Sequence, residues 1–185
     1  MLRIHRPSLD YQAFYCEENV WRLLARQELG ACRAWAVIVS SRSGHFVARR
    51  QKAGRPVDGL VCWDYHVFAV ADAQGATRLA LDLDSDLPFP CPLLRYLEES
   101  FLPTARASWQ PCFRVIAAND YLANFASDRS HMRRPDGSYL APPPPWPAPG
   151  GERTNTFMSW IDVSSGSSGA RYDLAQMRVF ATQGA

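Results

Sequence analysis

The fold of this chain is decided by residues 61–84, which read VCWDYHVFAVADAQGATRLALDLD. Residues 61–71 and 77–83 are rich in β-branched, aromatic and other apolar side chains, a composition typical of strands. The glycine at position 75, between them, favours a tight turn because glycine adopts a left-handed backbone conformation without steric cost. The stretch therefore predicts an antiparallel β-hairpin.

The length of the turn determines which side chains share a face of this hairpin. A three-residue loop, Ala73–Gly75, places His66 directly opposite Asp82. A two-residue loop, Gln74–Gly75, shifts the pairing by one residue and turns Asp82 to the opposite face. We favour the longer loop because it explains the glycine and separates polar from apolar side chains.

In the favoured register the apolar side chains, including Trp63 and Tyr65, point away from His66 and are expected to form core. A carboxylate that accepts a hydrogen bond from one imidazole nitrogen leaves the other nitrogen free to transfer protons. The pair of His66 and Asp82 is therefore a candidate acid–base site. Its alternatives are a surface ion pair and a buried structural network.

The rest of the chain alternates between helical and strand-like patterns, with no internal repeat. A short strand at 46–48 is expected to pair with the strand at 35–39 across a turn at Ser43-Gly44. The mixture of helices with an antiparallel hairpin predicts an α+β fold, with a central antiparallel sheet flanked by helices. Helices are expected from Cys16 to Gly30 and over residues 93–101, 120–125 and 173–180, with a further strand at 113–116.

Composition predicts one soluble domain over residues 1–185. With 20 Lys and Arg against 18 Asp and Glu, the formal charge is only +2, so we expect neither a nucleic-acid nor a membrane partner. No apolar run approaches the roughly 20 residues of a membrane span, and the start lacks the apolar core of a signal peptide. The proline-rich segment 141–151 is interpreted as a stiff connector rather than a recognition site.

The five cysteines, without CxxC spacing, resemble neither a disulfide framework nor a zinc module, and they favour a reducing compartment. Cys16 is the best candidate nucleophile, because it begins a predicted helix whose positive dipole end stabilises a thiolate. Glu17 and Glu18 oppose thiolate formation, so a protonated His66 would have to supply much of the activation. A buried structural role remains the alternative for any of the cysteines.

Several blocks of sequence together resemble the protein N-terminal glutamine amidohydrolases. They are YCEENVW at 15–21, WDYHV at 63–67, DLDSDLPFPC at 82–91, YLANFASDRSHM at 121–132, and the proline run with Trp146.

The resemblance covers residues 11–150, whereas the segment 152–185 shows only a loose match. It implies a fold related to papain-like and transglutaminase-like cysteine enzymes. It also implies a triad in which Cys16 is the nucleophile, His66 the acid and base, and Asp82 the orienting carboxylate.

The activity that the resemblance implies is deamidation of an N-terminal glutamine to glutamate through a thioester at the cysteine, with no metal and no organic cofactor. The expected partners are proteins or peptides that begin with glutamine. Such a reaction can mark proteins for degradation that depends on the N-terminus. The enzyme is expected to be a monomer in the cytoplasm or nucleus.

Selecting a chain terminus requires an acceptor for the α-ammonium group. Candidates are Asp64, which shares a strand face with His66, together with Glu17 and Asp128. The alternative role of Glu17 is to favour the helix dipole, and that of Asp128 is to cap a turn. His131 belongs to a matching block, but no role for it follows from the sequence.

Two other kinds of function are compatible with the sequence, one that uses the triad and one that does not. A transglutaminase-like or peptide-cleaving enzyme would use the same three residues on another acceptor. A non-catalytic module that binds N-termini would not need the nucleophile at all.

Overall fold

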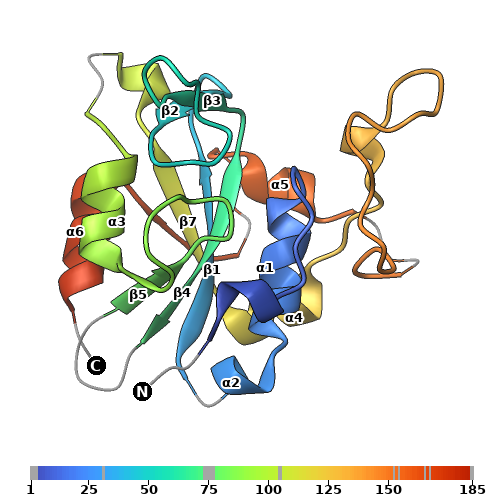
Figure 1. Cartoon of the computed structure of the whole chain (residues 1–185), viewed down its shortest axis with the longest axis horizontal. Coiled ribbons are helices and arrows are strands. Elements are labelled where there is room, and N and C mark those ends of the chain that lie inside the picture. The colour runs from blue at the N-terminus through green and yellow to red at the C-terminus, as the bar shows by residue number, and fades with distance from the viewer. Residues whose placement is uncertain are drawn as a thin grey trace.

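A six-stranded antiparallel sheet forms the centre of the structure, a computed structural model (Figure 1). Its strands run in the order β6-β5-β4-β1-β7-β8, and a separate two-stranded sheet pairs β2 with β3. The strands are β1 Ala34–Ser40, β2 Phe46–Ala48, β3 Val61–Trp63, β4 His66–Asp72, β5 Arg78–Leu81, β6 Cys91–Pro92, β7 Cys112–Ala117 and β8 Ala170–Tyr172. The structure describes residues 4–30, 32–72, 78–103, 106–151, 153, 155–164, 166 and 168–183.

Helices cover both faces of the central sheet, as Figure 1 shows with α3 and α6 on one side and α1, α4 and α5 on the other. Each face therefore has its own apolar core, and the expected α+β class with a central antiparallel sheet is confirmed. The α-helices are α1 Cys16–Leu24, α2 Gln27–Gly30, α3 Leu93–Ser100, α4 Ala118–Asn124, α5 Phe157–Ile161 and α6 Leu174–Thr182, and the 3-10 helices are η1 Arg6–Ser8, η2 Ala107–Trp109 and η3 Ser130–Met132.

The two cores follow from the alternation of side chains along the strands. On β4, Val67 and Ala69 pack with α1, α4 and α5, whereas Phe68 and Val70 pack with α3 and α6. The sheet is thus apolar on both faces, as expected for a sheet that helices cover on both sides.

The hairpin of β4 and β5 forms, but its register differs from the favoured one by two residues. Ala69 pairs with Leu81 and Asp72 with Arg78, so His66 is not directly opposite Asp82. The expected loop Ala73–Gly75 lies outside the described residues, which end at 72 and resume at 78. A shift of two residues preserves the alternation of faces, and His66 and Asp82 therefore stay on the same side.

Two expectations about the strands are wrong. The predicted strand 61–71 is broken at Asp64-Tyr65, so its first part, β3, belongs to the small sheet. There Phe46 pairs with Trp63, and β2 does not pair with β1 as the turn at Ser43-Gly44 suggested. The break excludes Trp63 and Tyr65 from the alternation of side chains along β4. Their side chains therefore need not point away from His66.

The predicted helix from Cys16 to Gly30 is also divided, since α1 ends at Leu24 and α2 begins at Gln27. The α1 helix is amphipathic, and its apolar residues Val20, Leu23 and Leu24 face the sheet core. This packing holds the amino end of α1, with Cys16, against the start of β4.

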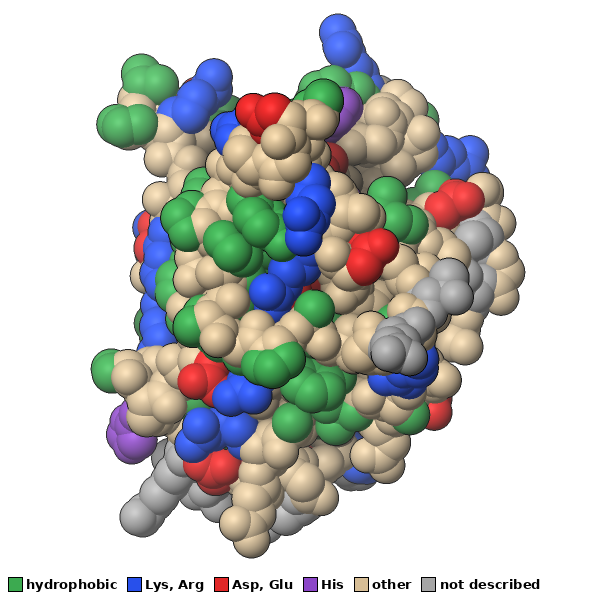
Figure 2. Space-filling view, turned by 90° about the vertical axis from the view of Figure 1, so that its right-hand side faces the viewer, with side chains coloured by type: hydrophobic (Ala, Val, Ile, Leu, Met, Phe, Trp, Pro, Cys, Tyr) green, Lys and Arg blue, Asp and Glu red, His purple; other side chains and the backbone are tan. Residues whose placement is uncertain are grey.

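The proline-rich segment 141–151 packs against α1 instead of serving only as a connector. The hydroxyl of Tyr15 donates to the Ala141 carbonyl at 3.2 Å, and the indole of Trp146 donates to Glu18 at 2.9 Å. In Figure 1 the chain between α4 and α5 extends to the right of α1. Figure 2, which turns this side to the viewer, shows basic, acidic and hydrophobic side chains interspersed.

None of the described helices combines the length and apolar character needed to cross a lipid bilayer.

Candidate active site

The α1 helix begins at Cys16, and the chain enters it through an unusual backbone conformation. Phe14 has φ of 69°, a left-handed value that bulky residues rarely adopt. Its side chain remains 57% exposed, while the following Tyr15 is fully buried. Strained backbone of this kind is concentrated at functional sites, where surrounding packing enforces it.

His66 occupies the first position of β4, opposite Val39 on β1. Its imidazole is 2% exposed and is stacked on Trp63, with ring centres 5.8 Å apart and an interplanar angle of 14°. The break between β3 and β4 makes this stacking possible, because a continuous strand would point the two side chains to opposite faces. Trp63 was expected in the core, and it is partly buried against the core on the α3 and α6 side while it also stacks on His66.

Asp82 follows the last residue of β5 and lies against His66. Its Oδ2 atom is 3.1 Å from Nε2 of His66. Oδ2 also accepts hydrogen bonds from the Gln51 amide at 2.9 Å and the Tyr96 hydroxyl at 2.8 Å. Oδ1 accepts the backbone N–H of Asp84 at 2.9 Å.

These donors explain why Asp82 stays ionised although it is only 2% exposed. Burial alone would raise its pKa, but the contact with His66 and the hydrogen bonds outweigh burial and lower it to about 2. Burial likewise opposes the charged form of His66, yet the Asp82 carboxylate prevails and the pKa of His66 is raised. The raised pKa makes His66 a stronger base than a free imidazole, and Asp82 stabilises the imidazolium that forms when His66 takes up a proton.

A cavity of about 670 Å³ brings Cys16 and His66 together, since both line its wall. The exposed side chains of Phe14, Leu140 and Met158 form part of the same wall. Asp82 contacts His66 from behind and is not among the lining residues. Cys16 and His66 thus line one cavity, and Asp82 contacts the imidazole of His66.

The resting thiol of Cys16 is protonated. Burial raises its pKa well above the ordinary value, and the carboxylates of Glu17, Asp84 and Asp82 raise it further. The amino end of α1 does not overcome these effects, so thiolate formation depends on a base. This agrees with the expectation that Glu17 opposes the thiolate, whereas activation by a protonated His66 stays a prediction.

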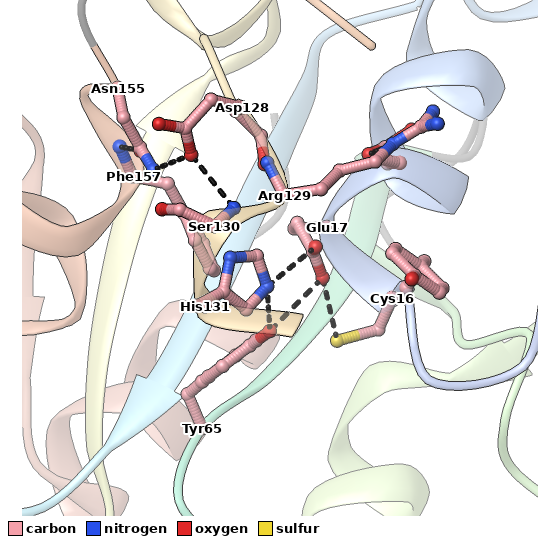
Figure 3. Close-up of polar contacts among 12 residues, drawn as sticks. Cys16, Glu17, Tyr65, Asp128, Arg129, Ser130, His131, Asn155 and Phe157 are labelled. Carbon is pink, nitrogen blue, oxygen red and sulfur yellow. Dashed lines mark hydrogen bonds and ion pairs between the residues drawn. The ribbon is translucent and has the colours of Figure 1, made fainter. Parts of the chain in front are cut away.

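Glu17, Tyr65 and His131 form a second polar group beside Cys16 (Figure 3). Glu17 is fully buried, with Oε2 3.7 Å from the Cys16 sulfur and 3.4 Å from the Tyr65 hydroxyl. Nε2 of His131 lies 3.2 Å from that hydroxyl and 3.5 Å from Oε1 of Glu17. Tyr65 and His131 line the cavity, so Tyr65, which was expected in the core, is also part of its wall.

The three acids expected to bind an α-ammonium group lie in different surroundings. Asp64 lines the cavity, is exposed, and accepts the backbone N–H of Tyr65 at 2.9 Å. Glu17 lies behind the wall, in the group just described. Asp128 is not among the lining residues, and it caps a turn by accepting from the backbone of Ser130 and the amide of Asn155, both at 2.9 Å (Figure 3).

Sequence reasoning missed several residues of the site. One of them is Asp84, which lines the cavity. The sequence could have indicated it, because Asp84 lies two positions after Asp82 and alternate residues of an extended chain tend to share a face. Gln51 and Tyr96 reach Asp82 across 31 and 14 residues, and no local pattern marks them. Among the described residues, no group of three or more His, Cys, Asp or Glu side chains is placed to hold a metal ion.

Comparison with known proteins gives consistent matches. A family model described as N-terminal glutamine amidase matches residues 11–181. A protein N-terminal glutamine amidohydrolase of Drosophila grimshawi is 43% identical over 178 residues, covering 90% of this chain and 85% of the relative. Proteins of the same name from Drosophila willistoni and Drosophila ananassae are 43% and 42% identical, with the same coverage.

Proposed function

Because this chain belongs to the N-terminal glutamine amidase family, we propose that Cys16, His66 and Asp82 are the triad with which it acts. The chain is an amidohydrolase that converts an N-terminal glutamine into glutamate and releases ammonia. The observation that supports the triad most is the shared cavity of Cys16 and His66, with Asp82 3.1 Å from the imidazole.

In the first half of the reaction His66 removes the proton of the Cys16 thiol as the sulfur attacks the carboxamide carbon of glutamine. The tetrahedral intermediate carries a negative oxygen, and we propose that the backbone N–H of Cys16 at the start of α1 stabilises it. The imidazolium then gives its proton to the departing nitrogen. The C–N bond breaks, ammonia leaves, and a thioester remains on the sulfur.

In the second half a water molecule attacks the thioester carbon while His66 takes its proton. The C–S bond breaks, the sulfur recovers a proton from the imidazolium, and glutamate is released. Asp82 contacts Nε2, which leaves Nδ1 for both proton transfers. We propose that this chemistry needs neither a metal nor an organic cofactor.

The α-ammonium group of the substrate requires an acceptor in or next to the cavity. Of the acids expected from the sequence, Asp64 lines the cavity but is exposed, and Glu17 lies behind the wall next to Cys16, Tyr65 and His131. Asp128 is already engaged as a turn cap outside the lining of the cavity, so it is not proposed as this acceptor.

We propose that the chain is related to papain-like and transglutaminase-like cysteine enzymes, since a cysteine at a helix start and a histidine on a strand line one cavity. We propose a single domain over residues 1–185, active as a monomer. Its free cysteines are compatible with the cytoplasm or nucleus, where proteins that begin with glutamine would be passed to N-terminal-dependent degradation.

The test is mass spectrometry of a peptide that begins with glutamine. Deamidation adds about one dalton and leaves the peptide intact, while peptide cleavage shortens it and a transferase adds an amine. We expect the mass gain with the wild type and no gain with Cys16→Ala or His66→Ala. If His66→Ala retained a sizeable fraction of wild-type turnover, His66 would not be the base.

A further inference from the structure

Asp84 lies in the wall of the cavity that Cys16 and His66 share. The hydroxyl of Tyr11, in the segment that leads into α1, donates to its Oδ1 atom at 2.6 Å. Asp84 is partly buried, whereas the other two carboxylates of the wall, Asp64 and Asp162, are exposed. Its carboxylate is therefore the most enclosed one that a ligand in the cavity can reach.

Asp84 has no cationic partner among the described residues. The nearby Lys52 ammonium instead donates to the Leu83 carbonyl at 2.7 Å and lies 4.6 Å from the centre of the Tyr11 ring. Burial raises the pKa of Asp84, although His66 and Lys52 act in the opposite direction. A fixed carboxylate without a counter-ion in a partly enclosed cavity is suited to a cation that arrives from solution.

We propose that Asp84, held in place by the Tyr11 hydroxyl, binds the α-ammonium group of the substrate's first residue. This inference rests on the proposed function and names the feature by which the enzyme recognises a chain terminus. An N-terminal glutamine carries its ammonium group three carbon atoms from the carboxamide carbon, so both ends of the residue must be bound in one small cavity. An internal glutamine has no such cation and leaves Asp84 unpaired.

Binding at Asp84 also affects the nucleophile. Burial keeps the pKa of Cys16 high, and Asp84 is one of the carboxylates that raise it further. An ammonium group next to Asp84 offsets this negative charge and eases thiolate formation. A substrate without the ammonium group should therefore lose turnover rate as well as affinity, because the interaction assists the transition state.

The first experiment measures binding without turnover. Titration calorimetry on Cys16→Ala compares a glutamine-initiated peptide with the same peptide lacking only the α-amino group. We expect the first to bind roughly 10- to 100-fold more tightly, as for a hydrogen-bonded charge pair. In Cys16→Ala/Asp84→Asn this preference should disappear, and in Cys16→Ala/Tyr11→Phe it should be reduced. If Cys16→Ala and Cys16→Ala/Asp84→Asn prefer the peptide with the α-amino group by the same factor, the proposal is overturned.

The matched control is Asp64→Asn, which removes the exposed carboxylate of the same wall and should keep the preference. Loss of the preference in Asp64→Asn and not in Asp84→Asn would assign the role to Asp64 and overturn the proposal. If Asp84→Asn folds poorly, Asp84→Ser provides the same test.

The second experiment measures ammonia release by variants that retain Cys16. Asp84→Asn should lower kcat/KM for the glutamine-initiated peptide roughly 10- to 100-fold and change kcat/KM for the des-amino peptide less than threefold. An equal loss on both peptides contradicts ammonium recognition. The proposed function is judged separately, because it fails only if the wild type releases no ammonia from the glutamine-initiated peptide.

Discussion

At the scale of single residues, the charge of a buried side chain depends on the hydrogen-bond donors around it. Asp82 is the clearest case, because a buried carboxyl would ordinarily be neutral, and here Gln51, Tyr96, the Asp84 backbone and His66 all act on it. The ionised Asp82 in turn favours the charged form of His66. The charge of the candidate site thus depends in part on Gln51 and Tyr96, which do not line the cavity.

Tyr96 is expected to be a positioning residue whose hydroxyl orients Asp82. Tyr96→Phe keeps the ring in its buried place and removes one hydrogen bond to a charged group, so kcat should fall about tenfold with little change in KM. The pH profile should also shift, because the acid–base pair is altered. Tyr121→Phe, which removes another buried hydroxyl, is the control and should leave the profile unchanged.

The lowered pKa of Asp82 predicts how stability depends on pH. A carboxyl with an ordinary value of 3.8 and a folded value of about 2 stabilises the fold above pH 3.8 and loses this effect as the pH falls towards 2. The contribution is about 2 kcal/mol. Urea unfolding of Asp82→Asn between pH 2 and 6 should show a flatter dependence than the wild type, and an unchanged dependence would contradict the assignment.

At the scale of elements, the breaks matter more than the strands and helices themselves. The interruption at Asp64-Tyr65 lets Trp63 stack on His66 and turns Tyr65 towards Glu17. The irregular segment after α4 also brings distant residues together. The backbone N–H of Ser127 donates to the Pro149 carbonyl, and this bond returns the proline-rich segment to the end of α4. The close approach of these two segments depends on Gly150.

Gly150 has φ of 91°, and a Cβ atom there would overlap with Cβ of Ala126. Gly150→Ala should therefore lower the free energy of unfolding by about 3 kcal/mol, through both backbone strain and overpacking. Its neighbour Gly151 has φ of 58° and nothing within 4 Å of such an atom, so Gly151→Ala should cost only about 1 kcal/mol. Urea unfolding of the two variants compares them, and equal losses would refute the packing argument.

At the scale of the whole molecule, a buried ion pair connects distant parts of the chain. Arg129 donates from Nε and from its terminal nitrogen to the two oxygens of Glu18, each at 2.7 Å, and also to the Trp146 carbonyl at 2.9 Å. The side chains of Glu18 and Arg129 are 0% and 10% exposed. The pair thus joins α1, close to Cys16, to the segment 128–151.

Breaking this ion pair should be strongly destabilising. Glu18→Gln leaves Arg129 buried without its counter-charge and should lower the free energy of unfolding by about 3–5 kcal/mol. Asp10→Asn, which breaks the exposed pair with Arg22, should cost less than about 1 kcal/mol. Thermal or urea unfolding distinguishes the two, and a small effect of Glu18→Gln would mean that the segment is held by packing alone.

The sequence by itself determined the local features of this protein. Alternation along residues 66–72 and 78–82 assigned His66 and Asp82 to one side of the sheet, even though the expected register was two residues away. The helix pattern that begins at Cys16 predicted the start of α1. These predictions succeeded because side-chain periodicity and helix starts depend on neighbours only a few residues apart.

Only the tertiary structure decided which distant groups meet. It ended β3 at Trp63, brought Gln51 and Tyr96 to Asp82, placed Tyr11 on Asp84, and paired Glu18 with a residue 111 positions away. The lengths of loops and the packing of whole helices on the sheet control these contacts. Neither leaves a periodic trace in the local sequence, because the same turn or strand residues are compatible with several registers and neighbours.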